Sequence, residues 1–205
     1  FRLSSMRKGL LILLGALLLL TPASAQVVLL NESFEGDFPP DGWDVLNAPG
    51  TSYGWERNNP ANRSNYAGSG YCAIADSLGH DNSYIDSLLS TSVDLTTGYT
   101  SAKLEFNMSY VHGTDEAILS ITSLLTGEKI EKKWTSNETG KVTIDLTSYC
   151  GGWIILAWEY KGSGGYWEID DVRVTAETAA IPEFPGFALV LAVLASISLG
   201  VLLRR

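Results

Sequence analysis

The stretch GGYWEIDDVRV, residues 164–174, decides how the chain is interpreted. Its apolar residues alternate as in a β-strand, with Trp167 and Ile169 on one face and Val172 and Val174 on the other. Two acids, Asp170 and Asp171, interrupt the pattern and are expected to point to opposite faces. If the sheet is covered, one carboxylate is therefore buried, which is costly without a partner. The acidic pair needs an explanation.

Strand-like alternation recurs through the middle of the chain. In KLEFNMSY, residues 103–110, apolar and polar side chains alternate strictly. Similar runs occur in VVLLNESF, YCAIAD, AILSITSLL, KVTIDL and WIILAWEY, separated by Gly, Asn, Pro, Ser and Asp. Many short strands joined by turn residues predict an all-β fold, an antiparallel β-sandwich of jelly-roll type.

The order of these segments resembles a known family of surface domains. FE, GW, YCA, IDLT, LAWEY and WEIDDV follow one another between residues 34 and 172. This order is similar to that of the choice-of-anchor J, or cleaved adhesin, domains of prokaryotic surface proteins, with a weaker similarity to MAM domains. The similarity covers nearly all of residues 26–180. It implies a β-sandwich that acts in adhesion or recognition.

The opening FE and the closing IDDV are also similar to those of jelly-roll carbohydrate-binding modules. In these relatives a structural calcium ion commonly ties the first strand to the last. The resemblance implies a Ca²⁺ site formed by Glu35, Asp170 and Asp171. Calcium suits the position because it takes roughly six to eight oxygen ligands and compensates buried carboxylates. Weaker candidate ligands are Glu32, Asp37 and Asp76.

An alternative without metal accounts for the same acids. Asp171 then pairs with Arg173 or a backbone N–H, and Asp170 is solvated at a strand edge. Both explanations are open at the level of sequence.

The N-terminal segment has the three parts of a secretory signal peptide. A start at Met6 is followed by a basic region, the apolar run LLILLGALLLL and an Ala23-Ser24-Ala25 site, which predicts cleavage before Gln26. A retained membrane helix is the alternative. The expected organisation is upstream residues and signal peptide at 1–25 and one sandwich domain at 26–180.

The C-terminal segment predicts an anchor. A Pro-containing stalk at 181–186 precedes an apolar run and a basic end at 187–205, which fits a transmembrane helix with Arg204 and Arg205 on the cytoplasmic side. The tail resembles archaeal sorting signals of the PEF type (Pro182, Glu183, Phe184) and the PGF type (Pro185, Gly186, Phe187). The resemblance implies an archaeosortase-like enzyme that replaces the helix with a lipid anchor. A permanent helix is equally open, and both place the domain on the extracellular face of the membrane.

The charge distribution excludes one class of partner. The part of the chain between the two terminal apolar segments holds nine basic and all 23 acidic residues, a formal net charge of −14. Nucleic-acid binding requires clustered Lys and Arg, so no nucleic-acid partner is expected. An envelope glycan or a surface protein is the expected partner.

Two modifications are predicted for an exported domain. Cys72 and Cys150 are expected to form a disulfide, with two buried thiols as the alternative. Four Asn-X-Ser/Thr sequons are candidate glycosylation sites: Asn31, Asn62, Asn107 and Asn137.

The aromatic content favours binding over catalysis. His112-Gly113-Thr114 has no accompanying nucleophile segment, so no enzyme is predicted. The loop TSYGWERNNPANRSNY contains the candidate ligand-binding residues Tyr53, Trp55, Arg57 and Tyr66, although Trp55 is alternatively a core residue. The predicted function is a non-catalytic, surface-anchored adhesion or recognition domain. A carbohydrate-binding module and a structural component of the surface layer are the alternatives.

Overall fold

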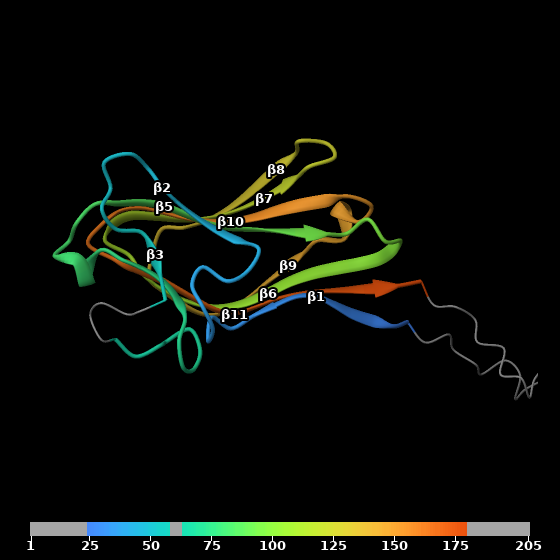
Figure 1. Cartoon of the computed structure of the whole chain (residues 1–205), viewed down its shortest axis with the longest axis horizontal. Helices are drawn as coiled ribbons and strands as arrows, with labels where there is room; N and C mark the ends of the chain where they lie inside the picture. Colours follow the sequence, from blue (N-terminus) through green and yellow to red (C-terminus); the bar gives the residue numbers. More distant parts are fainter. Residues whose placement is uncertain (1–23, 58–62, 180–205) are drawn as a thin grey trace, which may run out of the picture. The chain divides into compact units, whose positions relative to one another are not determined.

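The computed structural model describes residues 24–57 and 63–179, which fold into two antiparallel β-sheets packed face to face (Figure 1). The first sheet has the order β3-β4-β11-β6-β9, with β1 also paired to β11. Its strands are β1 (Gln26–Glu32), β3 (Trp55–Glu56), β4 (Ala73–Asp76), β6 (Tyr99–Val111), β9 (Glu138–Asp145) and β11 (Tyr166–Thr178). The second sheet has the order β2-β5-β10-β7-β8. Its strands are β2 (Trp43–Asn47), β5 (Ile85–Asp94), β7 (Thr114–Ser123), β8 (Lys129–Trp134) and β10 (Trp153–Ser163).

The predicted all-β antiparallel sandwich is confirmed. Most successive strands from β5 to β11 alternate between the sheets, and the first and last strands are neighbours, which is consistent with a jelly roll. Two short 3₁₀ helices, η1 (Leu78–His80) and η2 (Thr147–Tyr149), complete the elements. Neither of the 3₁₀ helices within residues 24–57 and 63–179 could span a bilayer.

The core follows the period-two patterns of the central strands. In β6 the four predicted inward residues are buried: Leu104, Phe106, Met108 and Tyr110. Trp158 of β10 stacks on Trp43 of β2 with ring centroids 5.6 Å apart, and Phe106 meets it edge-on from the opposite sheet. Trp167 packs against both Trp55 and Trp134. Large aromatic side chains from both sheets therefore fill the interior.

Strand β11 contains a β-bulge at the acidic pair. Asp170 pairs with Asn107 of β6, and the next paired residue, Arg173, lies opposite Glu105, so β11 has one extra residue. Asp171 takes a left-handed conformation with φ of 51°. The bulge puts both acids on the outer face, and the expected opposite placement of the apolar residues is wrong. Five apolar side chains face the core instead: Trp167, Ile169, Val172, Val174 and Ala176.

The bulge lies where the edge partner of β11 changes. Before it, β11 pairs with β4 as far as Ile169 opposite Ala73. After it, β11 pairs with β1, beginning at Val172 opposite Glu32. The acidic pair occupies the gap between these two edge strands.

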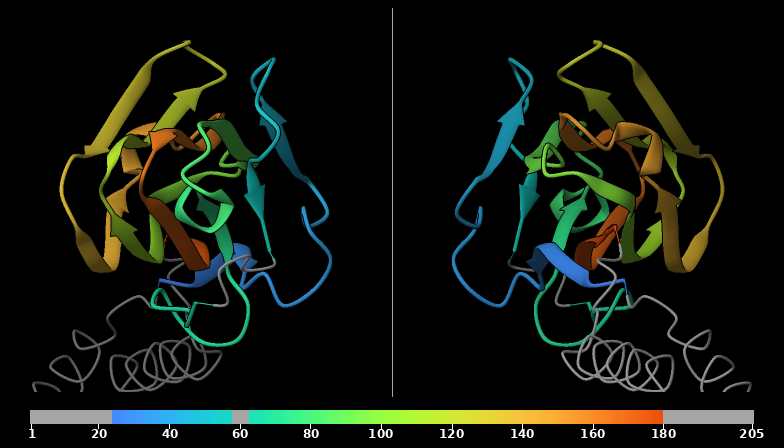
Figure 2. Two further views of the ribbon diagram at one scale, coloured as in Figure 1. Left: turned by 90° about the vertical axis from the view of Figure 1, so that its left-hand side faces the viewer. Right: turned by 90° about the vertical axis from the view of Figure 1, so that its right-hand side faces the viewer.

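The two ends of the sandwich differ in what they carry. Gln26 pairs with Glu177, so the described chain enters and leaves at one end (Figure 1). We call this the exit end; η2 and the start of β10 also lie there. At the opposite end, called the loop end, η1 lies beside the β10–β11 turn, since the backbone N–H groups of Ser77 and Leu78 donate to the carbonyl oxygen of Gly165. Figure 2 views the sandwich from both ends.

The predicted disulfide is wrong, because both cysteines are free thiols. Cys72 is buried next to β4, which pairs with the first residues of β11. Cys150 follows η2, which packs near Ala102, and Ala102 lies opposite Ala176 near the other end of β11. The two residues lie at different places along the sandwich, too far apart for a bond that needs Cα atoms within about 7 Å.

Several predicted features fall outside the described residues. These are most of the signal peptide, the sorting motif, the C-terminal helix and the sequon at Asn62. Of the other sequons, Asn31 and Asn137 are exposed, whereas Asn107 is partly buried and donates to Asp171. Their glycosylation stays a prediction.

Candidate recognition site on the loop before strand β4

A loop covers the outer face of β11 in front of the bulge. Residues 63–72, here called the cover loop, lead into β4. Beneath it the outward side chains of β11 are buried: Tyr166, Glu168 and Asp170. Strand β11 is therefore buried on both faces at this point, which explains why acids here cannot simply face water.

Carboxylates of β11 hold the cover loop by hydrogen bonds. The backbone N–H of Tyr66 donates to Glu168 Oε2 at 3.0 Å. The side-chain amide of Asn65 donates to Asp170 Oδ2 at 2.9 Å and to the carbonyl oxygen of Tyr71 at 3.2 Å. Asn65 therefore bridges the strand and both ends of the loop.

A third carboxylate comes from the segment after β1. The backbone N–H of Tyr71 donates to Glu35 Oε1 at 2.9 Å. Two glycines make these close approaches possible, since a Cβ at Gly68 would clash with Asp170 and a Cβ at Gly70 would clash with Glu35. Gly70 also has a φ of +73°, which other residues rarely adopt.

A partly buried ion pair fixes the start of the cover loop. Arg63 Nε lies 2.9 Å from Asp76 Oδ2, and Asp76 is fully buried at the end of β4. The guanidinium also lies over the ring of Tyr166, 4.6 Å from its centroid. Asp76, a weaker candidate for metal binding, is thus neutralised by a side chain of the chain itself.

Glu168 is the least satisfied of these acids. Its Oε1 atom is buried and has no hydrogen-bond partner among the described residues. Burial raises the pKa of Glu168 to about 7, although the Tyr66 and Ala67 N–H groups oppose the shift. Burial likewise raises the pKa of Asp170. Burial and the charges of Glu168, Asp170 and Glu35 raise the pKa of the Cys72 thiol, so this cysteine stays protonated.

The structure brings together only part of the predicted calcium site. Glu35 and Asp170 both lie against the cover loop. Asp171 points elsewhere and accepts a hydrogen bond from the Asn107 amide at 2.9 Å. No three His, Cys, Asp or Glu side chains form a metal-binding group within residues 24–57 and 63–179. A cation here would therefore depend on backbone carbonyls and Asn65 for further oxygens.

Sequence reasoning missed Glu168 and Asn65. Glu168 appeared to be an ordinary polar residue of an alternating strand, and only the cover loop makes its face an interior one. Asn65 acts across 105 positions of sequence, and no local pattern signals such a contact.

The cover loop presents exposed aromatic side chains. Tyr66 and Tyr71 are 58% and 48% exposed. The guanidinium of Arg57 lies over the Tyr71 ring, 4.5 Å from its centroid, and donates to the carbonyl oxygens of Glu35 and Gly36. The arrangement offers aromatic faces beside a cationic donor, which is a chemistry that suits sugar hydroxyls.

A second aromatic group lies at the loop end. The Tyr53 ring stacks on His80 with centroids 3.7 Å apart, and His80 Nε2 lies 2.8 Å from Glu56 Oε1. Trp55 lies between the groups in sequence but is only 4% exposed, and its Nε1 donates to the Ser87 carbonyl. The prediction that Trp55 contacts a ligand at the surface is therefore wrong, and the alternative of a core residue holds.

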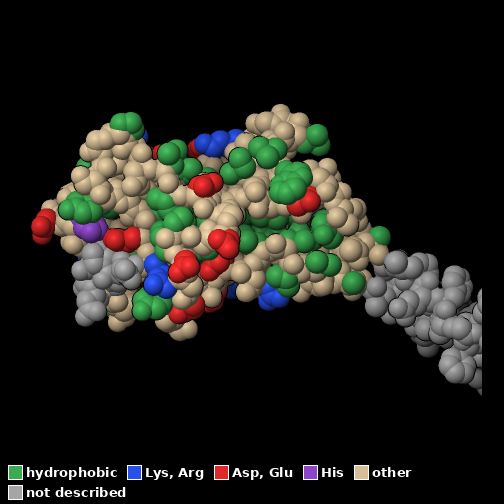
Figure 3. Space-filling model, in the orientation of Figure 1, with side chains coloured by type: hydrophobic (Ala, Val, Ile, Leu, Met, Phe, Trp, Pro, Cys, Tyr) green, Lys and Arg blue, Asp and Glu red, His purple; other side chains and the backbone are tan. Residues whose placement is uncertain are grey.

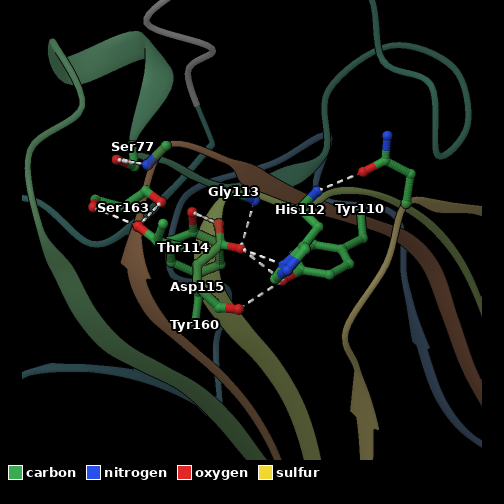
Figure 4. Close-up of polar contacts among 10 residues, drawn as sticks. Ser77, Tyr110, His112, Gly113, Thr114, Asp115, Tyr160 and Ser163 are labelled. Carbon is green, nitrogen blue, oxygen red and sulfur yellow. Dashed lines mark hydrogen bonds and ion pairs between the residues drawn. The ribbon is translucent and has the colours of Figure 1, made fainter.

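The histidine of the HGT segment belongs to a structural network (Figure 4). Asp115 Oδ1 accepts hydrogen bonds from the Tyr110 hydroxyl at 2.7 Å and the Gly113 N–H at 2.9 Å, and it lies 3.1 Å from His112 Nδ1. The Tyr160 hydroxyl donates to Oδ2. Both oxygens of this buried carboxylate are thus used to tie the β6–β7 turn to β10.

The described domain is acidic. Carboxylates lie at several separate places on the face seen in Figure 3, with few basic side chains among them. A pocket of about 300 Å³ opens on the outer face of the six-stranded sheet, lined mainly by hydroxyl-bearing and charged side chains. None of the described residues that line it is aromatic.

Comparison with known proteins identifies solved structures with a similar fold. Scans against protein-family profiles and against curated protein sequences found no match. Among solved structures, the chain is similar to the K3 cleaved adhesin domain of Lys-gingipain from Porphyromonas gingivalis, with a TM-score of 0.52 and 20% identity over 74% of this chain and 99% of that domain. The K1 domain of the same protein gives 0.51 and 22%, over 73% and 97% of the two chains. The module TmCBM61, solved in complex with β-1,4-galactotriose, gives 0.50 and 20%, over 70% and 93%. The predicted similarity to cleaved adhesin domains and carbohydrate-binding modules is therefore confirmed at the level of the fold.

Proposed function

We propose that this chain is a non-catalytic recognition domain displayed on the outer face of a cell membrane, where it binds an envelope glycan or the sugar of a surface protein. The observation that carries the proposal is the exposure of Tyr66 and Tyr71, with Arg57 stacked on the latter, on a loop held rigid by buried carboxylates. Rigid aromatic faces bind sugar rings without a large cost in conformational entropy. The similarity to TmCBM61, which was solved with a galactose trisaccharide, supports sugars as the ligand class.

A glycan array with purified protein tests the proposal. Tyr66→Ala and Tyr71→Ala should each weaken the wild-type signal, because each removes a stacking face. Tyr84→Ala is the matched control, since Tyr84 is 52% exposed but lies outside the cover loop, and it should leave the signal unchanged. An array with no sugar bound, together with self-association or a fixed stoichiometry with surface-layer protein, would favour a structural role instead.

Display at the surface is part of the same proposal. The predicted signal peptide and C-terminal apolar segment support export and anchoring, through the helix itself or through a lipid attached by an archaeosortase-like enzyme. Mass spectrometry of the native protein distinguishes the two anchors. Retention of Arg205 would exclude cleavage.

A structural calcium ion at the cover loop is also proposed. Its ligands would be Glu35 and Asp170, which both lie against the cover loop, together with backbone carbonyl oxygens and the Asn65 side chain. Bound calcium would compensate the carboxylates and hold the loop against β11. EGTA should then lower the melting temperature of the protein, and added calcium should restore it by mass action on the folded state. Identical melting curves in EGTA and in calcium would refute the site.

A further inference from the structure

An exposed apolar patch lies at the exit end of the sandwich. It consists of Leu124 and Leu125 of the β7–β8 turn and Trp153 at the start of β10, with 56%, 74% and 44% of their surfaces exposed. They form one surface, since the N–H of Leu124 donates to the carbonyl oxygen of Trp153 at 2.8 Å and Leu125 lies against Gly152. We call it the exit patch. Nothing in the recognition site uses it.

The position of the exit patch indicates which partner it contacts. Trp153 pairs with Asp94 at the end of β5, and Leu95 next to it exchanges backbone hydrogen bonds with Gly151 and Gly152. This corner lies at the end where the described chain stops at residue 179. The apolar run begins at Phe187, eight residues later, and eight residues span at most about 28 Å. If that run is anchored in a membrane, the exit end is held close to the bilayer.

We propose that the exit patch rests on the lipid bilayer, with Trp153, Leu124 and Leu125 in the interfacial layer. This inference depends on the anchor in the proposed function but not on the sugar site. Tryptophan favours the membrane interface because its ring is apolar and its N–H is polar, and neighbouring leucines add apolar area. The partner is a zwitterionic lipid surface rather than an anionic one, because the domain is strongly acidic and Asp94 and Glu128 flank the patch. The loop end then faces away from the membrane.

The tryptophans of the chain make the contact measurable. All six lie in the described domain, and the other five are at most 5% exposed. The chain with its C-terminal segment is placed in phosphatidylcholine nanodiscs, with and without brominated acyl chains that quench nearby indoles. The emission lost on Trp153→Phe defines the signal of Trp153. It should be quenched in brominated discs, while the emission that survives in Trp153→Phe should not be.

Matched variants separate contact from proximity. Leu124→Ser combined with Leu125→Ser should reduce the quenching of Trp153. Leu46→Ser is the control: Leu46 is 68% exposed, but it lies on β2 opposite Leu88 and outside the exit patch, so its substitution should leave the quenching unchanged. Equal Trp153 emission in the two kinds of disc, for a chain that co-elutes with them, would overturn the proposal while leaving the anchor intact. Shielding of Trp153 by a second copy of the chain would overturn it too. Failure to enter the discs would refute both the anchor and the inference. Loss of sugar binding alone would leave the anchor and the inference unaffected.

Discussion

At the scale of single residues, buried carboxylates are the groups that connect separate parts of the chain by hydrogen bonds. Glu168, Asp170, Asp76 and Asp115 are all at most 5% exposed, yet each holds a different backbone segment or side chain in place. Three of them accept hydrogen bonds at both oxygens. Glu168 is the exception, because its Oε1 has no partner in the described part of the chain. It is therefore the acid whose ionisation should cost the fold most.

We expect the free energy of unfolding of the Glu168→Gln variant to increase relative to that of the wild type as pH rises. The folded-state pKa of about 7 lies above the usual value of 4.5 for a glutamate, so the folded state binds more protons between these values and wild-type stability falls as pH increases. The neutral amide lacks this dependence. In EGTA, the difference in unfolding free energy between variant and wild type should shift in favour of the variant by about 3 kcal/mol at most between pH 4.5 and pH 8.

Urea denaturation at both pH values checks this expectation. Glu138→Gln, at an exposed position of β9, serves as the control and should show the same pH dependence as the wild type. A constant difference between Glu168→Gln and wild type across the range would contradict a shifted pKa.

At the scale of elements, the bulge in β11 reconciles the acids with the apolar pattern. Without it, Val172 and Val174 would face away from the core that Trp167 and Ile169 occupy, since a shift of one residue reverses every side chain. The extra residue lies where β4 ends and β1 begins along the same edge. One strand can therefore bury its apolar side chains on both sides of the interruption.

Substitutions at Asp171 should reveal the backbone requirement of the bulge. Asp171→Val should lower the free energy of unfolding by about 2 kcal/mol, because a β-branched residue resists the left-handed conformation at φ of 51°. Asp171→Gly should be nearly neutral, since glycine adopts this conformation freely and only an exposed hydrogen bond to Asn107 is lost. Chemical denaturation gives both values.

Arg173→Val is the control on the same strand. Arg173 is exposed beyond the bulge, where valine suits the strand, so little change is expected. If Asp171→Val were no worse than Arg173→Val, the conformation of residue 171 would have no part in stability.

At the scale of the whole molecule, the sandwich is stabilised by its core rather than by a covalent bridge. Both sheets contribute aromatic side chains to one continuous cluster, in which Trp158 and Trp167 are completely buried. The free thiols at Cys72 and Cys150 lie apart from each other. The domain presents the cover loop on the face of one sheet, and the first and last strands of the described chain begin and end at the exit end.

The melting temperature should therefore not depend on reducing agent. A disulfide closing the long loop between these cysteines would contribute about 4 kcal/mol, which a thermal scan detects easily. We expect identical melting temperatures for the oxidised protein, the protein in dithiothreitol and the Cys150→Ser variant. A fall of several degrees on reduction would show that the bridge forms after all.

Much of the fold could be predicted because a strand that is buried on one face has apolar and polar residues in alternation. The inward residues of β6 and β10 follow directly from alternation, and the positions of Gly, Pro and Asn mark the turns. Trp55 was the ambiguous case, since an aromatic residue in a polar loop suits a surface platform and a core equally well. Contact with Trp167, 112 positions away, places it in the core.

By itself, the sequence of this protein determined the all-β class, the acidic character of the domain and the presence of apolar segments at both ends, because composition and periodicity are local properties. Only the tertiary structure decided the role of the acidic pair in GGYWEIDDVRV. The bulge, the cover loop and the exchange of edge strands bring together residues from four separate parts of the chain. Asp170 lies under the cover loop and Asp171 beside Asn107, because a contact between distant segments depends on how sheets pair rather than on any neighbouring residue.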